Sequence, residues 1–241
     1  MTNPDPVSNH ETDPRQRLLD AATELFAERA FKDVSIREIC EKAGGANVAS
    51  VNYYFRDKAG LYRELLESML ARWEAERERH AKLIEGKPPE EKLYLYVRWF
   101  IGNILEERAD ERDMLFGKIL SREMADQTPE FGLVVEKGMV PNWRRLMAIV
   151  AEVAGLPEGS QPVLACTQST MGQCLAYGSM RKLGKYFGHA EFQYTPEFID
   201  SIARHITRFS LAGIRAVTQQ NRESGAVDKA GPGCSGTPPE E

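Results

Sequence analysis

Cysteine is scarce in this chain, and its spacing suits neither metal binding nor redox chemistry. Four cysteines occur, and none of them forms a C-x-x-C pair. This pattern excludes the common zinc and thioredoxin-like motifs. Cys166 and Cys174 would lie roughly 12 Å apart along one helix, whereas a disulfide needs Cα atoms within about 7 Å. Two interpretations remain for these cysteines: small apolar core residues, or a redox sensor.

Long apolar runs are also missing. No segment approaches the ~20 residues that a membrane-spanning helix needs. The first residues, Met1 to Glu11, have neither a basic start nor an apolar centre, so they do not resemble a secretory signal. We therefore expect a cytoplasmic protein with no membrane partner.

Motifs that carry enzymatic chemistry are absent as well. The four histidines lie far apart, at positions 10, 80, 189 and 205, without metal-ligand spacing. The sequence contains no G-x-S-x-G nucleophile motif, no P-loop and no Rossmann glycine pattern. We expect a protein that is not an enzyme, with no cofactor and no metal site.

The charge balance argues against nucleic-acid binding over the whole surface, because the net charge is −5. One segment departs from it. Between Arg29 and Arg63 there are seven basic and four acidic residues, which gives seven minus four, or +3. This local excess is compatible with a small basic patch.

The apolar residues that are present repeat at a helical period nearly everywhere, and no stretch alternates convincingly. We predict an all-α protein with an N-terminal three-helix helix-turn-helix domain and a larger C-terminal helical domain. The predicted organisation is a disordered N-terminus at 1–12, a first helical domain at 13–58, a larger helical domain at 59–221 and a disordered tail at 222–241. The tail is rich in Gly, Pro and charge, so it has little to bury.

Capping residues locate the first helices. Asp13 and Pro14 suit the N-cap and first position of one helix. Ser35 and Glu38 form an S-x-x-E capping box for a second, which Gly44-Gly45 should end. Asn47 can cap a short helix from Val48 to Tyr54, and Asp57 can cap a long one from Lys58 to about Ile84.

Later helices are expected after Pro88-Pro89, at about 112–124, from Pro129 to Ala154, at about 160–186, and from Thr195-Pro196 onward. Pro141 should kink the third of these, because proline lacks the N–H that continues a helix.

Two short helices around a glycine turn favour a helix-turn-helix whose second helix, NVASVNYYF, enters the major groove. We expect Val48 and Val51 to point inward and Asn47, Ala49, Ser50 and Asn52 to face the bases. Small and amide side chains suit close approach and hydrogen bonding. The start of the next helix, at Lys58, could bind a phosphate through its charge and its N–H groups.

The aromatic triplet has two interpretations. Aromatic clusters are more often core than contact surface, and we assign Phe55 to the core. Tyr53 and Tyr54 could either pack inside or reach the DNA backbone. A ligand-binding or adaptor protein without DNA activity is therefore the competing hypothesis.

The segment SIREICEKAGG-ANVASVNYYFRDKAGLYREL resembles the DNA-binding domain of the TetR/AcrR family, over about residues 13–70. Its specific part is the aromatic-aromatic-Phe, then x-x-Lys and Leu-Tyr. The stretches Arg122–Ala125, Thr128-Pro129 and CTQSTMGQCLAY are similar to the C-terminal domain of the CecR-like subgroup, which extends the resemblance to roughly 13–220. The resemblance implies a dimer on a palindromic double-stranded operator, usually repressing, that leaves DNA when a small molecule binds.

Position by position, the resemblance implies DNA contacts from these residues: Arg37, Asn47, Ala49, Ser50, Asn52, Tyr53, Tyr54 and Lys58. Two positions depart from the family pattern. Ala30 stands where Gly is common, so the turn after the first helix should be built without positive φ. Gly44-Gly45 is one residue longer than usual, which could rotate the recognition helix.

The resemblance also makes residues 13–58 a helix-turn-helix DNA-binding domain and residues 59–221 a regulatory and dimerisation domain, with a four-helix dimer interface on the last two long helices. Small residues permit close helix approach there, although tight internal packing would use the same composition. The expected interface residues are Gly172, Leu175, Ala176, Ser179, Ile202, Ile206 and Phe209.

An effector pocket would lie among the helices of the second domain, and ordinary core packing is the alternative for each lining residue. The candidates are Trp99, Phe100, Met114, Phe116, Met139, Trp143, Met147 and Gln168. Aromatic and methionine lining suits an apolar or amphipathic molecule.

Overall fold

The structure, a computed structural model, describes residues 13–105, 111–183, 186 and 194–223. Every regular element in these ranges is helical, and the described residues contain no strand. The all-α prediction is therefore confirmed. Within the same ranges, no helix combines the length and the apolar character needed to cross a membrane.

Four α-helices form the first part of the chain, with one 3₁₀ turn, Phe31–Asp33, between the first two. They are α1 (Pro14–Glu28), α2 (Ile36–Lys42), α3 (Val48–Phe55) and α4 (Lys58–Ile84). Their starts are those predicted from the caps at Asp13, Ser35, Asn47 and Asp57.

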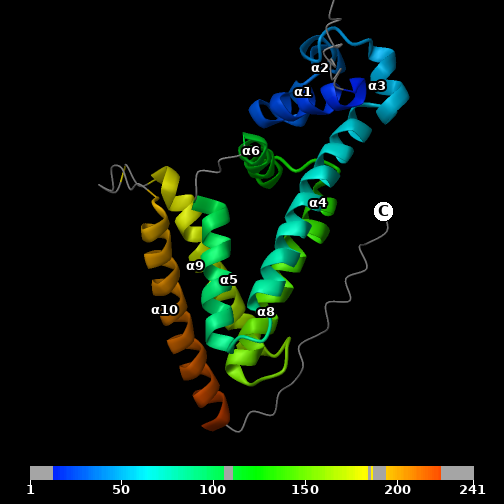
Figure 1. The fold of residues 1–241 in the computed structure, drawn as a ribbon. Helices are drawn as coiled ribbons and strands as arrows, with labels where there is room; N and C mark the ends of the chain where they lie inside the picture. The colour runs from blue at the N-terminus through cyan, green and yellow to red at the C-terminus, as the bar shows by residue number, and fades with distance from the viewer. Residues whose placement is uncertain (1–12, 106–110, 184–185, 187–193, 224–241) are drawn as a thin grey trace, which may run out of the picture. The chain divides into compact units, whose positions relative to one another are not determined.

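The remaining helices follow the predicted order (Figure 1). They are α5 (Pro89–Leu105), α6 (Glu111–Ala125), α7 (Phe131–Val134), α8 (Val140–Ala154), α9 (Gln161–Leu183) and α10 (Pro196–Glu223). Residues 1–12 and most of the predicted tail lie outside the described residues. The helix α10 ends at Glu223, so it includes the first two residues of the predicted tail.

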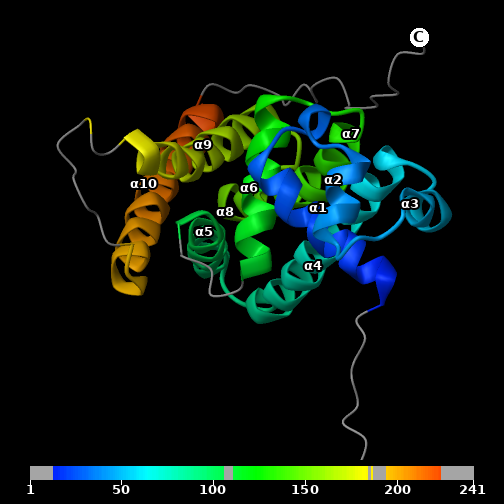
Figure 2. The same cartoon turned by 90° about the horizontal axis from the view of Figure 1, so that it is seen from above.

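Contacts divide the chain into two compact units. Unit 1 comprises Met1–Trp73 and Ala109–Val134, and unit 2 comprises Glu74–Arg108 and Val135–Glu241. Unit 1 therefore contains α6 and α7 as well as the helix-turn-helix, and α6 contacts α1 (Figure 2). This division into units differs from the domain boundary that we expected at residues 58–59. That boundary concerns which residues form the DNA-binding domain, and it stays a prediction.

The core of unit 1 is formed by the apolar faces of its first four helices. Its buried residues include Leu18, Ala22 and Phe26 of α1, Ile39 of α2, Val51 and Phe55 of α3, and Leu61 and Leu65 of α4. Phe26, Phe31 and Tyr62 form an aromatic cluster with ring centroids 4.7 to 5.7 Å apart. Burying large aromatic side chains is a major source of stability in a small unit.

The core of unit 2 lies among α5, α8, α9 and α10. Its fully buried residues include Tyr96 and Ile101 of α5, Val150 of α8, Cys174 of α9 and Ile206 of α10. The helices α9 and α10 lie side by side in both views (Figures 1 and 2).

The helix expected to start after Thr128-Pro129 and reach Ala154 is not one regular α-helix, and Pro141 lies in the first turn of its last part. A π-helical segment, Val135–Met139, separates α7 from α8. Because Pro141 has no N–H, the carbonyl of Lys137 loses its normal helical donor four residues later. That carbonyl instead accepts a hydrogen bond from the Arg77 guanidinium, with an Nη2–O distance of 2.9 Å.

Candidate nucleic-acid interface

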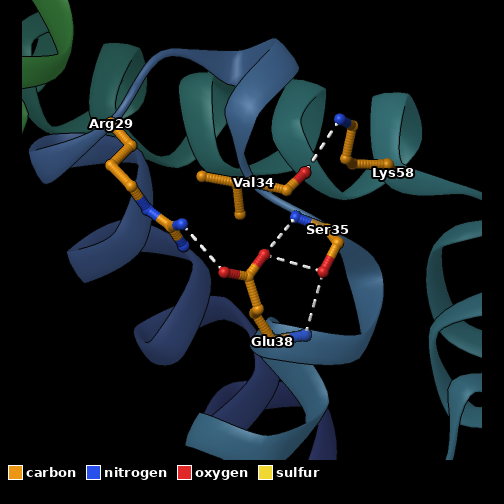
Figure 3. A network of polar contacts seen from close by, with 5 residues as sticks. All are labelled: Arg29, Val34, Ser35, Glu38 and Lys58. Carbon is orange, nitrogen blue, oxygen red and sulfur yellow. Dashed lines mark hydrogen bonds and ion pairs between the residues drawn. The ribbon is translucent and has the colours of Figure 1, made fainter.

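The turn after α1 is built without positive φ, as expected from an alanine at this position. Ala30 has φ −64° and ψ 152° and precedes the 3₁₀ turn. Lys58 closes this turn, since its Nζ donates to the carbonyls of Phe31 and Val34, each at 2.9 Å (Figure 3 shows the second bond). The ammonium also lies 4.4 Å from the centre of the Phe31 ring. Lys58 thus connects the start of α4 by hydrogen bonds to the segment that precedes α2.

The start of α2 carries the predicted capping box. The Ser35 side chain accepts from the Glu38 N–H, and the Glu38 carboxylate accepts from the Ser35 N–H at 2.8 Å (Figure 3). Arg29 donates to the other carboxylate oxygen at 2.8 Å. The hydrogen bonds from Ser35, together with Arg29, lower the pKa of Glu38 to about 2. Glu38 is therefore ionised at neutral pH, which favours the N-terminus of α2.

The glycine pair ends α2 in a conformation that other residues rarely adopt. Gly44 and Gly45 have φ of 90° and 81°. The N–H groups of Gly45 and Ala46 both donate to the Cys40 carbonyl at 3.0 Å, which satisfies the end of the helix. The second glycine is thus part of the helix ending and places Asn47 at the N-cap of α3, where its side chain accepts from the Ala49 N–H.

The helix α3 presents most of the predicted recognition residues to solvent. Asn47, Ala49 and Asn52 are exposed, and Ser50 is half-buried. Val51 is fully buried as predicted, but Val48 is 43% exposed. The inward placement of Val48 was wrong, because this first residue of the helix lies on its open side. Val48 is therefore an exposed apolar residue of α3 that the sequence interpretation did not place among the recognition residues.

The aromatic triplet divides between the two interpretations. Phe55 is buried, which confirms its core assignment, whereas Tyr53 is 82% exposed. Tyr54 is half-buried, and its ring meets Tyr53 edge-on at 4.9 Å between centroids. Tyr53 is thus available for contact with a partner, and Tyr54 supports its orientation.

The junction between α3 and α4 depends on a glycine that the sequence interpretation did not single out. A Cβ on Gly60 would lie 2.0 Å from the Phe55 carbonyl oxygen. The Gly60 N–H donates to the Asp57 side chain at 2.8 Å, which caps α4. Asp57 and Gly60 together permit the close approach that joins the recognition helix to α4.

Surface ion pairs hold most basic side chains of this region. Arg37 pairs with Glu41 at 3.1 Å, Lys42 with Glu24 at 2.6 Å, and Arg29 with Glu38. Such exposed pairs are worth about 0–1 kcal/mol each, so a phosphate can displace them at little cost. Arg56, at the end of α3, is exposed and has no carboxylate partner among the described residues.

Two residues of the Arg122–Ala125 motif attach α6 to the helix-turn-helix within unit 1. Arg122 donates to the carbonyls of Ala27 and Glu28 at the end of α1. The buried Glu123 accepts hydrogen bonds from the Tyr62 hydroxyl on α4 and from the Thr128 hydroxyl at 3.0 Å. Burial and this bond raise the pKa of Tyr62, which stays protonated.

The eight candidate pocket residues fall into different places. Met114 and Phe116 belong to unit 1, where Met114 is exposed and Phe116 is core. In unit 2, Trp99, Phe100, Trp143 and Met147 pack on the core cluster, Met139 is half-buried, and Gln168 is exposed. A depression of about 360 Å³ between α5 and α10 is lined by other residues, namely Tyr94, Arg204, Thr207 and Arg208. The predicted effector pocket therefore stays a prediction.

The candidate interface residues divide in the same way. Ile202 and Ile206 were expected in the dimer interface, but they lie in the core of unit 2, because this side of α10 packs inward. Gly172, Leu175, Ala176 and Ser179 of α9 and Phe209 of α10 are exposed. Other exposed apolar residues, Met180 and Val217, occur on the same helices.

The described cysteines behave as core residues. Cys40 and Cys174 are buried, and burial raises the pKa of Cys174 to about 12. Cys166 is half-buried, and burial raises its pKa too. Raised thiol pKa values disfavour the reactive thiolate that a redox sensor needs. Cys234 lies outside the described residues.

Two family models match this chain. The model described as bacterial regulatory proteins, tetR family, matches residues 18–65. The model described as the C-terminal domain of the HTH-type transcriptional dual regulator CecR matches residues 89–214. Between them they cover the helix-turn-helix and most of α5 to α10.

Two curated proteins are similar in sequence. A probable HTH-type transcriptional regulator, YttP of Bacillus subtilis, is 26% identical over 137 residues, which cover 52% of this chain and 64% of the relative. The HTH-type transcriptional dual regulator CecR of Shigella flexneri is 26% identical over 195 residues, covering 77% and 82%. The chain thus spans less than two thirds of the first relative and more than two thirds of the second.

Solved structures share the fold. A transcriptional regulator from Rhodococcus sp. superposes with a TM-score of 0.58 at 18% identity, covering 84% of this chain and 97% of that one. A TetR-family regulator from Mesorhizobium loti gives a TM-score of 0.56 at 19% identity, covering 83% and 95%. At such identities the likeness concerns the fold alone.

Proposed function

This chain belongs to the TetR family of bacterial transcriptional regulators and has a C-terminal domain of the CecR type, and we propose that it binds a palindromic operator as a homodimer. In this proposal it acts in the cytoplasm as a repressor, and a small molecule releases it from DNA. The regulators of this family are not enzymes.

The open face of α3 is the observation that carries the DNA-binding part. Asn47, Ala49, Asn52 and Tyr53 are exposed on one short helix, whose other side, Val51 and Phe55, is anchored in the core. A rigidly held helix with small and amide side chains fits the major groove, where Asn pairs with adenine. Arg37, Arg56 and Lys58 would supply phosphate contacts around it, and Tyr54 would support Tyr53.

The apolar stripes on α9 and α10 support the dimer. Gly172, Leu175, Ala176 and Ser179 recur at helical spacing on α9, and Phe209, 65% exposed, lies on the neighbouring α10. Apolar residues gathered on an open face suit a self-complementary two-fold interface. A two-fold protein reads a two-fold DNA site.

A mobility-shift titration on the DNA upstream of the protein's own gene, at rising salt, tests the proposal. Binding should weaken steeply, because each neutralised phosphate contributes a slope of about −0.9 in log affinity against log salt. Asn52→Ala should relax preference at one base position, costing about 1–3 kcal/mol on the preferred site. The exposed Gln168→Ala on α9 is the matched control and should bind as wild type does. Absence of salt-sensitive binding would favour the adaptor hypothesis.

A further inference from the structure

Two buried basic side chains in unit 2 have no acidic partner. Arg77 and His80 lie one turn apart on α4 and are 8% and 6% exposed. Across from them, Arg145 of α8 is half-buried. Among the described residues, no carboxylate lies within ion-pair distance of Arg77 or Arg145. Glu74, one turn away and exposed, acts on Arg77 only at longer range.

The hydrogen bonds that these two arginines donate to backbone carbonyls use only some of their N–H groups. Arg77 donates through Nη2 to the Lys137 carbonyl that Pro141 leaves free, and Arg145 donates through Nη1 to the Arg77 carbonyl at 2.6 Å. The other terminal nitrogen of Arg77, Nη1, is buried without a partner. A buried cation that is only partly hydrogen-bonded is costly, and an anion would offset that cost.

Two acceptors beside the guanidinium are unpaired as well. His80 uses Nε2 as the donor to the Leu95 carbonyl at 3.2 Å, so in the neutral ring Nδ1 carries a lone pair, and Nδ1 has no partner. Burial lowers the pKa of His80, which favours the neutral ring. Asn142 donates to the Gly138 carbonyl at 3.2 Å, which leaves its Oδ1 buried and unpaired.

Hydrogen bonds and ring contacts connect these groups to one another. Arg77 and Asn142 bond to the adjacent carbonyls of Lys137 and Gly138 in the π-helical segment, and π-helical turns often mark functional sites. The Tyr96 hydroxyl donates to the Asn142 carbonyl at 3.0 Å. The Trp99 ring stacks on His80 with 4.9 Å between centroids. An aromatic wall thus stands beside a cation and two free acceptors.

We propose that this cluster binds an organic acid: Arg77 and Arg145 hold its carboxylate, His80 Nδ1 or Asn142 Oδ1 accepts a hydrogen bond from a neighbouring hydroxyl or amide, and Trp99 contacts its apolar body. The cluster's role as the effector site rests on the proposed function, but its ability to bind an acid does not. The ligand class is thereby narrowed from apolar or amphipathic molecules to amphipathic carboxylic acids with a donor close to the acid group.

The test uses 2-hydroxybenzoate, which combines a carboxylate, an adjacent donor and one ring, on the full chain without DNA. Binding should quench tryptophan fluorescence saturably and raise the Tm by about 5 °C at 100 times the Kd. The neutral 2-hydroxybenzamide should bind at least about 10-fold more weakly, since a hydrogen bond to a charged group is lost. Equal binding of acid and amide, or no saturable response to the acid up to about 10 mM, overturns the proposal.

Variants with matched controls separate binding from folding. Arg77→Met and Arg145→Met should each lower the affinity for 2-hydroxybenzoate about 10- to 100-fold. The exposed neighbours Arg79→Met and Arg144→Met should leave it unchanged. Wild-type affinity in both core variants overturns the proposal. If Arg77→Met does not fold, the Arg145→Met variant and the comparison of acid with amide still test whether the cluster binds a carboxylate.

Inorganic phosphate tests whether any oxyanion suffices. It should compete at least about 10-fold more weakly than the aromatic acid, because it has no apolar body for Trp99. Equal competition would contradict the carboxylate assignment. Operator binding of the unliganded wild type is measured separately, so a failure of the DNA proposal is distinguished from a failure of this site.

Discussion

The two units treat their buried ionisable side chains differently. In unit 1 the buried Glu123 carboxylate accepts hydrogen bonds from the hydroxyls of Tyr62 and Thr128. In unit 2 the buried Arg77 and His80 each keep an unpaired nitrogen. A satisfied buried network makes one arrangement rigid, whereas an unsatisfied one leaves polar groups that an added partner could pair. Among the described residues, the buried ionisable groups with an unpaired nitrogen thus lie in unit 2, where we propose that a ligand binds.

The largest effect should come from the closest approach in unit 1. Gly60→Ala places a Cβ against the Phe55 carbonyl, and because both groups belong to the backbone, the helices α3 and α4 must separate. We expect a loss of about 2–4 kcal/mol in the free energy of unfolding and loss of operator binding. Thermal unfolding followed by circular dichroism measures the first effect.

Gly117→Ala is the control for that change. Gly117 lies within α6 of the same unit, and a Cβ there meets nothing within 4 Å. It should be neutral or raise stability by up to about 1 kcal/mol, since alanine favours a helix over glycine. A Gly60→Ala protein as stable as Gly117→Ala would remove the proposed reason for the glycine.

The difference between the units is tested directly by removing one charge from each. Glu123→Ala leaves the Tyr62 and Thr128 hydroxyls without their acceptor and should cost about 3 kcal/mol in unfolding free energy. Arg77→Met replaces an incompletely paired cation by an apolar side chain of similar length and should change stability by less than about 1 kcal/mol. Chemical unfolding of both variants measures the contrast.

Two outcomes would contradict this comparison. Arg77→Met could lose as much stability as Glu123→Ala. In that case the role of Arg77 would be only structural, as the hydrogen-bond donor to the Lys137 carbonyl. Alternatively, Glu123→Ala could match the exposed Glu67→Ala on α4, whose carboxylate pairs with Arg63 on the surface. In that case the network around Glu123 would add nothing to unit 1.

A smaller effect is expected at Lys58, for which the structure adds a role. Lys58→Met removes two hydrogen bonds to the carbonyls of Phe31 and Val34 and should cost about 1–2 kcal/mol of stability. It should also weaken binding to all DNA sequences alike if the start of α4 contacts a phosphate. The exposed Arg56→Met should weaken DNA binding without the stability loss. Tm and DNA affinity are measured on both variants. An unchanged Tm in Lys58→Met would show that Lys58 acts on phosphate alone.

The smallest effect concerns pH. The pKa of Glu38 is about 2 in the folded protein against 4.5 unperturbed, so its contribution to stability is complete above about pH 5 and is lost as the pH falls toward 2. The difference in Tm between wild type and Glu38→Gln should therefore shrink over this range. Ser35→Ala, which removes the strongest cause of the lowered pKa, should flatten the dependence. A difference in Tm that grows on acidification would reverse the sign we assign.

Local chemistry explains which features the sequence predicts well. The caps at Asp13, Ser35, Asn47 and Asp57 depend on residues at most three positions away, and each is confirmed. The alanine at position 30 and the glycines at 44 and 45 constrain φ locally, so their turns follow from residue type. Pro141 likewise removes one helical N–H, and it lies directly after the π-helical segment Val135–Met139.

Features that depend on distant neighbours escaped the sequence. Val48 was expected to point inward, because helical spacing does not show at which residue of an eight-residue helix burial by neighbouring helices begins. Ile202 and Ile206 were assigned to a partner-facing surface, although the neighbouring helices cover that side of α10. One available signal was overlooked: Arg77 and His80 continue, at spacings of four and three, a buried stripe that runs from Trp73 to Ile84.

By itself, therefore, the sequence determined most of the helices, the caps of the first four and the family of this regulator, because capping, glycine and proline effects and the recognition motif act over a few residues. Only the tertiary structure decided the partners of Lys58, Arg122 and Glu123, the closeness of Gly60 to Phe55, and the unpaired atoms around Arg77. Those features join residues 5 to 95 positions apart in the chain, and no local preference encodes which polar groups meet when helices pack.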